Sequence, residues 1–410
     1  MILSKALQSS GAVLIEGAKW CGKTRTAQQA ARSILMMQDP DRKTAYLQTA
    51  SIKPSLLLEG ETPRLLDEWQ IAPIIWDAVR FTVDQRDKTG QFILTGSAVP
   101  ADNVTAHTGT GRISRMRMRP MSLFESQESA GSISMNELFS NSVDISGINP
   151  ISIERFATII VRGGWPASIR VEAEIAEKRA MDYVDAVINL DVSRVDNVEK
   201  SPAKVRALMR SLARNIATEA SMATIKNDLE GQDESITLPT VSSYLNALER
   251  IFVVEDLPAW NPALRSKTPL RTSAKRHFVD PSIATAVMGI SANRLMEDFN
   301  TFGYLFESLC IRDLRIYANL LDGSVFHYRD KTGLESDAVI VLRDGSWAAV
   351  EVKMGAHEFD SAAENLRKFV NRVDTAKMRE PSFLMILSAT EFAYRRKDGI
   401  YVVPLGCLKP

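Results

Sequence analysis

The sequence predicts an α/β protein built from several domains. Three observations support this fold class: a glycine-rich loop directly after an apolar run near the N-terminus, amphipathic stretches in the middle, and alternating strand and helix patterns after residue 300. The chain has 410 residues, of which 45% are hydrophobic and 24% are charged, as in ordinary globular proteins. At roughly 100–200 residues per domain, this length favours two to four domains.

The composition excludes several classes of protein. Lysine plus arginine equals aspartate plus glutamate, 50 against 50, which excludes a globally basic nucleic-acid coat but not local basic patches. No stretch reaches the roughly 18 apolar residues of a membrane helix, and the N-terminus lacks the apolar core of a signal peptide. Cys21, Cys310 and Cys407 have no metal-binding spacing and are too few for a disulfide framework. We therefore expect a cytoplasmic protein that contacts no membrane.

The glycine-rich loop fits the G-x-x-x-x-G-K-T pattern of a phosphate-binding loop. A strand is predicted just before it, at residues 11–17, and a helix just after it, from Arg25 to Met36. Backbone N–H groups of the loop are expected to cradle phosphate, Lys23 to reach the β and γ phosphates, and the Thr24 hydroxyl to bind Mg²⁺. The residues of this loop are Gly17, Ala18, Lys19, Trp20, Cys21, Gly22, Lys23 and Thr24. They predict a site for ATP with Mg²⁺.

Two later strand ends are expected to complete this site. A short apolar strand ends in Asp67 and Glu68; we expect Asp67 to hold Mg²⁺ and Glu68 to polarise the attacking water. Read alone, this acidic pair is equally explained as a helix N-cap. Another strand, at residues 91–94, is followed by Ser97, whose hydroxyl is expected to sense the γ-phosphate, with a plain turn as the alternative.

Arg112 is the candidate arginine finger. It stands between a glycine-rich loop and a strand in which Arg115, Arg117 and Arg119 alternate with methionines. An arginine here is expected to act on the nucleotide of its own chain or of a neighbouring one. A solvated strand edge is the alternative.

Several segments together carry a family resemblance. GAKWCGKT, LLDEWQIAPIIWDAVR, GQFILTGSA, GRISRMRMRPMSLFE and VRGGWP resemble segments of a large group of bacterial and archaeal AAA-type ATPases whose C-terminal half is a domain of unknown function. The resemblance runs from Gly11 to the end of the chain. It implies an AAA-type P-loop ATPase core at 1–135 and a homo-oligomer, with a ring as one arrangement. In a ring, Arg112 would work in trans. The GGWP turn, taken by itself, is interpreted as a packing corner.

The middle of the chain predicts a helical extension at 136–200 and a winged-helix-like domain at 201–265. Residues 124–150 are rich in serine, asparagine and glycine and are typical of a linker or surface excursion. Within the winged-helix prediction, a third helix spans 240–251, and a strand begins at Phe252, where a wing would lie.

Two basic features in this region predict DNA binding. Arg206, Arg210 and Arg214 recur at every fourth position, opposite an apolar helix face. A second patch contains basic residues and no acid. Its members are Arg265, Lys267, Arg271, Lys275 and Arg276. The alternative is a helical lid or spacer with a solvated basic face.

Residues 266–410 predict a further α/β domain with a cluster of charged residues. Asp337 and Glu351 fall on predicted neighbouring antiparallel strands, and Glu351 and Lys353 share one strand face. Together with Glu307 on the preceding helix, these acids would hold one or two Mg²⁺ ions, with Lys353 orienting a water. The pattern resembles the D…(E/D)-x-K signature of restriction-endonuclease-like (PD-(D/E)xK) nucleases, and the element order fits that fold. The alternative is a structural ion-pair cluster.

Three functions are consistent with these features. The preferred hypothesis is an Mg-ATP-hydrolysing motor or switch that binds and remodels DNA, either duplex or branched. The second is an Mg²⁺-dependent nuclease regulated by its ATPase domain. The third is a signalling or defence switch that binds a protein partner.

Overall fold

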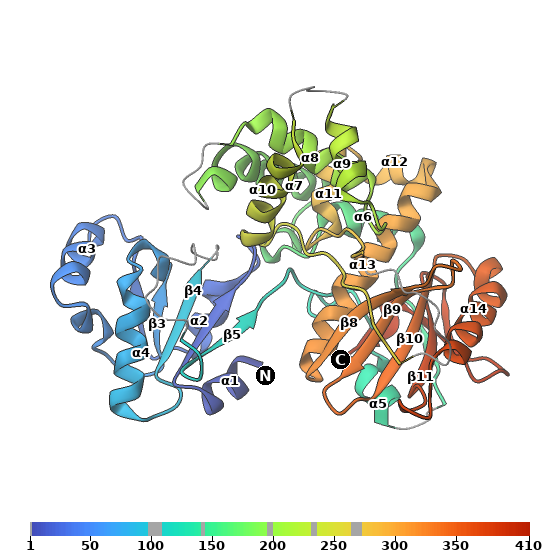
Figure 1. Cartoon of the computed structure of the whole chain (residues 1–410), viewed down its shortest axis with the longest axis horizontal. Coiled ribbons are helices and arrows are strands. Elements are labelled where there is room, and N and C mark those ends of the chain that lie inside the picture. The colour runs from blue at the N-terminus through green and yellow to red at the C-terminus, as the bar shows by residue number, and fades with distance from the viewer. Residues whose placement is uncertain (1, 97–108, 141–143, 195–199, 231–235, 264–272) are drawn as a thin grey trace. The chain divides into compact units, whose positions relative to one another are not determined.

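The computed structural model describes residues 2–96, 109–140, 144–194, 200–230, 236–263 and 273–410 (Figure 1). The chain forms two compact units. The N-terminal unit contains Met1–Pro120, Asn189–Lys200 and Asn246–Val253, and the C-terminal unit contains Met121–Ile188, Ser201–Leu245 and Val254–Pro410. These units do not follow the predicted boundaries at 135, 200 and 265, which remain predictions.

The N-terminal unit is built on a five-stranded parallel sheet with the order β2-β3-β4-β1-β5. Its strands are β1 (Ala12–Glu16), β2 (Ser33–Met36), β3 (Arg64–Asp67), β4 (Phe92–Gly96) and β5 (Ile113–Arg117). Its helices are α1 (Ile2–Ser9), α2 (Lys23–Ala30), α3 (Lys43–Ile52) and α4 (Ile74–Arg86). Because all five strands are parallel, their carboxyl ends meet at one edge, where β1 passes into the phosphate-binding loop.

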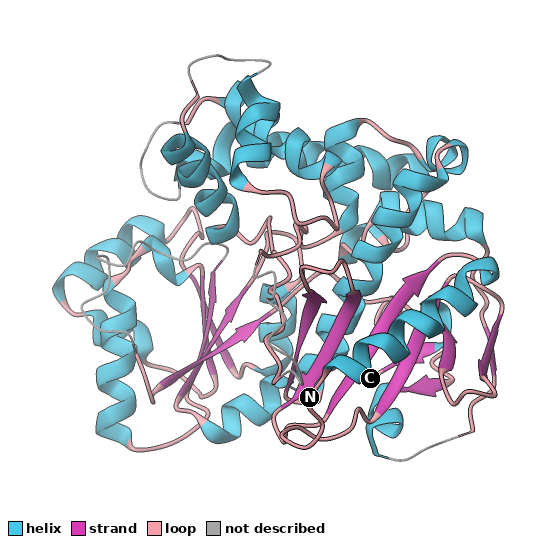
Figure 2. Cartoon of the chain, turned by 45° about the vertical axis from the view of Figure 1, so that its right-hand side comes forward, coloured by secondary structure: helices cyan, strands magenta, loops and turns pink. Residues whose placement is uncertain are grey.

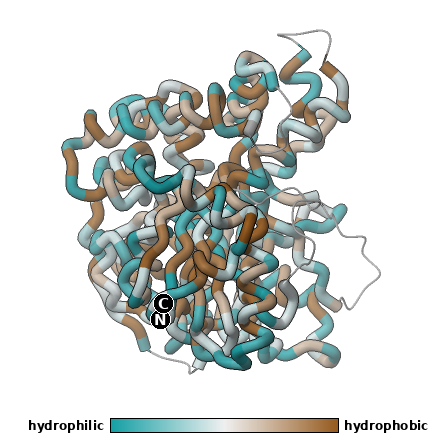
Figure 3. The backbone as a smooth tube through the Cα atoms, turned by 90° about the vertical axis from the view of Figure 1, so that its left-hand side faces the viewer, coloured by the Kyte–Doolittle hydropathy of each residue, from teal (hydrophilic) through white to brown (hydrophobic). Residues whose placement is uncertain are grey.

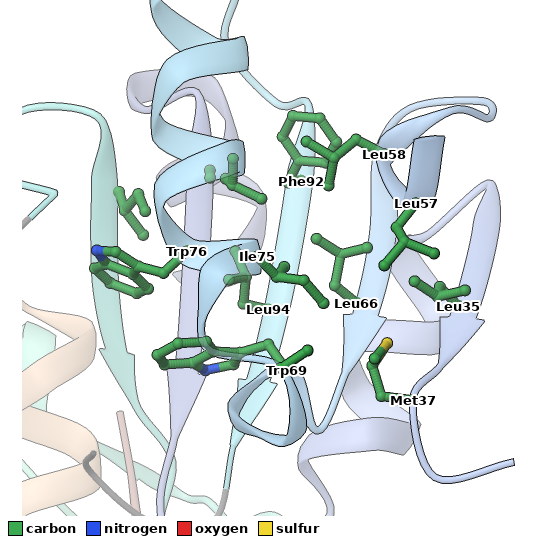
Figure 4. Close-up of a cluster of buried hydrophobic side chains, with 14 of the residues drawn as sticks. Leu35, Met37, Leu57, Leu58, Leu66, Trp69, Ile75, Trp76, Phe92 and Leu94 are labelled. Atoms are coloured by element: carbon green, nitrogen blue, oxygen red, sulfur yellow. The ribbon is translucent and has the colours of Figure 1, made fainter. Parts of the chain in front are cut away.

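Alternating side chains of these strands build two apolar cores, one on each face of the sheet. Val13 packs with residues of α1 and α2, whereas its neighbour Leu14 packs with residues of α4. Figure 2 shows the strands of this sheet and the helices beside them. The α4 face contains the larger cluster, in which the rings of Trp69 and Trp76 have centroids 5.0 Å apart (Figure 4). Strands buried on both faces explain why the sequence shows continuous apolar runs here.

The predicted helix from Arg25 to Met36 is wrong in its second half. Helix α2 ends at Ala30, and Ala31 has extended backbone dihedrals. The chain then forms the edge strand β2, which pairs in parallel with β3 and places Leu35 opposite Leu66. Burial of Leu35 in the apolar cluster stabilises a strand that local alanine content does not predict.

The C-terminal unit is built on a seven-stranded mixed sheet with the order β7-β12-β13-β11-β10-β9-β8. Its strands are β7 (Gly147–Ile148), β8 (Gly323–Arg329), β9 (Glu335–Leu342), β10 (Trp347–Lys353), β11 (Phe383–Ser388), β12 (Phe392–Arg395) and β13 (Tyr401–Pro404). Helices α13 (Phe299–Leu320) and α14 (Phe359–Arg372) both pack against β9 and β10. The antiparallel pairing predicted for the strands that carry Asp337 and Glu351 is confirmed, because β9 and β10 pair in this way.

The described residues of 124–150 form regular elements of the C-terminal unit, so of the two alternatives expected here the linker is wrong. Strand β6 (Ile133–Ser134) pairs with β14 (Leu408–Lys409), and β7 pairs with β12 at the edge of the large sheet. Helix α5 (Met135–Ser140) buries Met135 and Leu138. The sequence did not predict these elements for two reasons. The segment is rich in serine and glycine, and strands of two residues show almost no hydrophobic periodicity.

The remaining helices of the C-terminal unit form its helical middle. They are α6 (Ile153–Arg162), α7 (Ala173–Ala186), α8 (Pro202–Arg214), α9 (Met222–Glu230), α10 (Leu238–Arg250), α11 (Pro281–Met288) and α12 (Ala292–Glu297); the last residues of α10 belong to the N-terminal unit. The predicted face of α8 is correct, since Val205, Leu208 and Leu212 are buried while Arg210 and Arg214 are exposed.

The predicted wing strand is not formed among the described residues. After α10 the chain turns at Phe252, which has a positive φ of 60°. Val254 and Leu257 then make only isolated antiparallel bridges, to Phe278 and Lys275. Three helices of the predicted module are therefore present, but the strand that would support a wing is not.

Hydropathy along the chain alternates over short distances, so hydrophobic and hydrophilic positions lie side by side within helices (Figure 3). Among the described residues, no helix is both long and apolar enough to cross a membrane.

Candidate functional sites

The phosphate-binding loop connects β1 to α2, as its motif predicts. A Cβ atom at Gly17 would lie 2.0 Å from the carbonyl oxygen of Met118, and Gly17 has a φ of 152°. Gly22, directly before α2, has a left-handed φ of 101°. Glycine is therefore required at both positions, because any side chain would clash at the first and be strained at the second.

Lys23 lies over the loop with its side chain buried. Its Nζ donates hydrogen bonds to the carbonyl oxygens of Gly17 and Ala18, each at 2.8 Å. Burial lowers the pKa of Lys23, and the nearby carboxylates of Glu68 and Asp67 only partly offset this effect. A weakly solvated ammonium aimed at the loop is suited to bind phosphate oxygens.

Asp67 and Thr24 are in direct contact at the carboxyl edge of the sheet. Asp67 ends β3, is fully buried, and accepts hydrogen bonds from Thr24 Oγ1 at 2.7 Å and Thr95 Oγ1 at 2.6 Å. A hydroxyl and a carboxylate side by side are the oxygen ligands that Mg²⁺ prefers, so the residues present fit this ion. Sequence analysis missed Thr95, whose only signal is its place at the end of β4, between β1 and β3.

Glu68 follows Asp67 in a left-handed backbone conformation, with a φ of 54°. This conformation is strained for a residue with a side chain and is typical of functional positions. Burial, reinforced by the charge of Asp67, raises the pKa of Glu68. Gln70 donates a side-chain hydrogen bond to the Glu68 carboxylate. A carboxylate with a raised pKa, oriented by an amide, is suited to accept a proton from water.

The other loop residues differ in exposure. The side chain of Trp20 is exposed, and Trp20 has a φ of 67°. Cys21 is buried, and its thiol donates to the carbonyl oxygen of Met118 at 3.7 Å. Burial raises the pKa of Cys21, so it stays a thiol and packs the loop. Lys19 pairs at 2.5 Å with Asp191, an acid that the sequence analysis did not identify.

Arg112 does not lie beside the phosphate-binding loop of its own chain. It immediately precedes β5, whose first residue, Ile113, is in register with Ala12 at the start of β1. The loop follows the other end of β1, so the full length of the strand separates the two. Arg112 pairs instead with Asp84 at 2.6 Å. Arg112 therefore cannot act as an arginine finger on the nucleotide of its own chain, which was one of the two expected roles. Its role toward the nucleotide of a neighbouring chain remains a proposal.

Four predicted site residues lie outside the described residues. They are Ser97, Arg265, Lys267 and Arg271.

The charged residues of the predicted nuclease site do come together, with one unexpected member. Lys353 Nζ lies 3.3 Å from Glu351 Oε2 and 3.7 Å from Asp337 Oδ2. The additional member is Lys275, whose Nζ lies 2.8 Å from Glu307 Oε1 and 3.3 Å from Asp337 Oδ1. We call these five residues the charged cluster. Four of them, Lys275, Glu307, Asp337 and Lys353, line a cavity of about 790 Å³.

Three carboxyl groups in the charged cluster share two ammonium groups, so the acids titrate differently. Burial raises the pKa of Glu307 to about 7, despite the opposing charge of Lys275. Burial and the charge of Asp337 raise the pKa of Glu351 well above its ordinary value. Burial also opposes ionisation of Asp337, but the two ammonium groups outweigh it and lower the pKa of Asp337.

The metal site expected at Glu307, Asp337 and Glu351 is corrected. Within the described ranges, no group of three or more His, Cys, Asp and Glu residues is arranged to hold a metal ion. The Lys275 ammonium lies between Glu307 and Asp337, where a cation shared by these acids would have to bind. The residues present therefore fit an ion-pair cluster and do not fit a metal centre.

The predicted basic features are only partly exposed. Arg206 pairs with Asp185 at 2.7 Å, whereas Arg210 and Arg214 lie on the exposed face of α8. Lys275 is buried in the charged cluster, and Arg276 pairs with Asp256. The sequence analysis placed Lys275 and Arg276 in a basic surface patch for DNA. The structure shows that these two residues are not part of such a patch.

The GGWP turn is a packing corner, as interpreted from the sequence. Gly164 donates its N–H to Asp280 Oδ2 at 3.0 Å, and Trp165 Nε1 donates to Ser282 Oγ at 2.9 Å. Asp280 is fully buried and also pairs with Arg312 at 2.8 Å. The turn thus belongs to a buried polar network that joins α6 to α11 and α13.

Comparisons with known proteins assign the N-terminal segment. Residues 9–127 match the family model of an AAA domain, while residues 153–294 and 302–408 match two domains of unknown function, DUF8612 and DUF4143. A search of curated proteins found no significant match. The AAA-domain match and the geometry of the loop together support an AAA-type, ATP-hydrolysing P-loop domain.

Two of the solved structures that match this chain are distantly similar to it. The Walker-type ATPase PABY2304 of Pyrococcus abyssi shares 14% identity, covers 70% of this chain and 93% of its own, and has a TM-score of 0.43. A half-complex of Thermococcus gammatolerans McrB AAA+ hexamers with bound McrC shares 11% identity, covers 50% of this chain and 70% of that chain, and has a TM-score of 0.20. Both likenesses are too weak to carry an argument.

Proposed function

We propose that this protein is an Mg-ATP-hydrolysing AAA-type ATPase that uses its nucleotide state to act on DNA. The observation that carries the proposal is the grouping of Lys23, Thr24, Asp67 and Glu68 at one edge of a parallel sheet. Lys23 and the loop N–H groups would bind the β and γ phosphates, and Thr24 with Asp67 would hold Mg²⁺. The bound ion supplies charge neutralisation on the phosphate oxygens.

Glu68 would take the proton of the attacking water. Its raised pKa makes it a better proton acceptor than an ordinary surface glutamate, and Gln70 fixes its orientation. Asp67 accepts hydrogen bonds from the two threonine hydroxyls and, together with Thr24, would hold the ion. This division assigns metal binding and proton transfer to adjacent residues. Arg112 of a neighbouring subunit would supply the stabilising guanidinium in a homo-oligomer.

DNA is the proposed partner because α8 exposes Arg210 and Arg214 on the face that also carries Arg206. Positions four residues apart rise about 6 Å along a helix, so these arginines form a basic row that can contact the phosphates of a nucleic-acid backbone. The nuclease alternative is not carried forward, since the charged cluster does not fit a metal centre.

The test is ATP turnover by the full chain with and without duplex, single-stranded and branched DNA. The proposal predicts Mg²⁺-dependent hydrolysis that at least one of these DNAs stimulates. Hydrolysis unaffected by every DNA, together with no DNA binding at low salt, would leave an ATPase with a different partner. No hydrolysis under any condition would overturn the proposal itself.

A further inference from the structure

Asp191 contacts the phosphate-binding loop from a distant part of the sequence. Its carboxylate lies 2.5 Å from Lys19 Nζ, and its side chain is only 8% exposed, whereas that of Lys19 is 42% exposed. The two residues belong to the same compact unit, although Asp191 follows α7 and precedes α8, which belong to the other unit. Asp191, which lies in the connection between α7 and α8, therefore forms an ion pair with the phosphate-binding loop.

The local backbone at Asp191 is unusual. Residues Val187–Asp191 form a π-helical turn directly after α7. Such turns are rare in proteins and occur frequently at functional sites, because they place one side chain where a regular helix would not. Here the turn ends on the residue whose carboxylate meets Lys19.

A buried carboxylate beside a polyphosphate site is unfavourable while phosphate is bound, because like charges repel at this range. Lys19 can neutralise either Asp191 or a phosphate oxygen, but a single ammonium favours the more highly charged partner. We propose that Asp191 senses the nucleotide: it holds Lys19 until a triphosphate competes for that ammonium, and is then released. This assignment rests on the ATPase function proposed above. It adds a way for nucleotide binding to affect the rest of the chain.

The release of Asp191 has a direct route to the rest of the chain. Residues 189–194 and Lys200 belong to the N-terminal unit, and α8, which begins at Pro202, carries the exposed Arg210 and Arg214. Loss of the Lys19–Asp191 pair frees this connection at its α7 end. Nucleotide binding would thereby change the constraint on the helix proposed to contact DNA.

Nucleotide affinity tests the assignment in the full-length protein. The probe is a fluorescent, non-hydrolysable ATP analogue, and the variants are Asp191→Asn, Asp191→Glu, Lys19→Ala and the double variant Asp191→Asn/Lys19→Ala. Asp191→Asn should bind the analogue about tenfold more tightly than wild type, since it removes a competing charge worth roughly one order of magnitude. Asp191→Glu keeps the charge and should stay close to wild type. In the Lys19→Ala background, Asp191→Asn should change the affinity far less, because the two residues act through one pair.

Asp182→Asn is the matched control, since Asp182 pairs with Lys178 on exposed α7 and lies outside the loop. It should leave the affinity unchanged. Hydrogen exchange adds a readout that a merely structural pair would not move: backbone amides of residues 189–194 should exchange several-fold faster when the analogue binds wild type. In the Asp191→Asn variant, the same amides should exchange at this faster rate even when no analogue is bound.

The outcomes separate this assignment from the ATPase function. If wild type binds and hydrolyses ATP while Asp191→Asn matches it in affinity and exchange, the sensing role is refuted and the ATPase function stands. The sensing role is also refuted if Asp191→Asn changes the nucleotide affinity equally in the wild-type and Lys19→Ala backgrounds. If wild type binds no nucleotide, the ATPase function and this assignment fail together.

Discussion

Replacement of Lys275 by methionine should destabilise the C-terminal unit, and by an amount that depends on pH. Lys275 is buried and donates to Glu307 at 2.8 Å while also lying 3.3 Å from Asp337. Burial disfavours its charge, but these two carboxylates outweigh that effect, so the pKa of Lys275 lies well above its usual range. Methionine has a similar length without the charge. The variant therefore leaves Glu307 without a cation, while Asp337 keeps Lys353 and the Val352 N–H.

The size of the effect follows from the protonation of Glu307. Its ordinary pKa is 4.5 and its pKa in the folded protein is already about 7. The folded state therefore binds more protons than the unfolded state across this window, and the stability that Glu307 contributes falls as pH rises through it. Without Lys275, Glu307 must fold in its neutral form. Each pKa unit corresponds to about 1.4 kcal/mol, so a neutral Glu307 costs about 5 kcal/mol at pH 8 and about 1 kcal/mol at pH 5. The wild type already bears about 3 kcal/mol of this cost at pH 8 and nearly all of it at pH 5, because its Glu307 has a pKa of about 7. The loss that the variant adds through Glu307 is therefore about 1–2 kcal/mol at pH 8 and close to zero at pH 5.

Scanning calorimetry of wild type and Lys275→Met at the two pH values measures this difference. We expect a loss of about 3–5 kcal/mol at pH 8, the range for breaking a buried pair, and a loss smaller by about 1–2 kcal/mol at pH 5. Lys178→Met, which removes an exposed ammonium paired with Asp182, is the control and should shift no transition measurably. An equal loss at both pH values, or a variant as stable as wild type at pH 8, would refute this account of the charged cluster.

Four further outcomes are expected. Glu68→Gln should bind ATP with near wild-type affinity but lose turnover by at least about 100-fold, as an amide cannot accept the proton; turnover at the wild-type rate would remove Glu68 from this role. Arg112→Ala should lower turnover with little change in nucleotide affinity, and mixing it with Lys23→Ala should restore part of the rate; full activity of a strict monomer would contradict a trans finger. Alanine at Arg206, Arg210 and Arg214 together should weaken DNA binding and reduce its log–log salt slope by up to roughly three units; an unchanged slope places DNA elsewhere. Mn²⁺ should not raise the thermal stability of wild type, because Lys275 takes the place of a cation; a Mn²⁺-dependent rise that Asp337→Ala removes would restore the metal site.

Local sequence predicted the strands and the phosphate-binding loop because both depend on neighbouring residues. Apolar runs marked β1, β3 and β4, the alternation of arginines with methionines marked β5, and glycine positions marked the tight turns at Gly17 and Gly22. Edge strand β2 was missed because its stability comes from pairing with β3, which lies far along the chain. The same holds for β6 and β7, whose partners are near the C-terminus.

Long-range ion pairs account for what the sequence did not predict about the sites. The pattern of Glu307, Asp337 and Glu351 correctly placed these acids together, but the residue that neutralises them, Lys275, was grouped with surface lysines and arginines by proximity in sequence. Asp191 has no motif around it, and only folding brings it to Lys19. Burial decides the role of such residues, and burial of an isolated charged residue has no local signature.

ATP hydrolysis by purified wild type and Lys23→Ala, with Mg²⁺ and with a chelator, tests the central claim most directly. The account predicts that wild type hydrolyses ATP only with Mg²⁺ and that Lys23→Ala has no activity above background while remaining folded. Hydrolysis by Lys23→Ala at the wild-type rate, or a folded wild type that neither binds nor hydrolyses ATP, would contradict it.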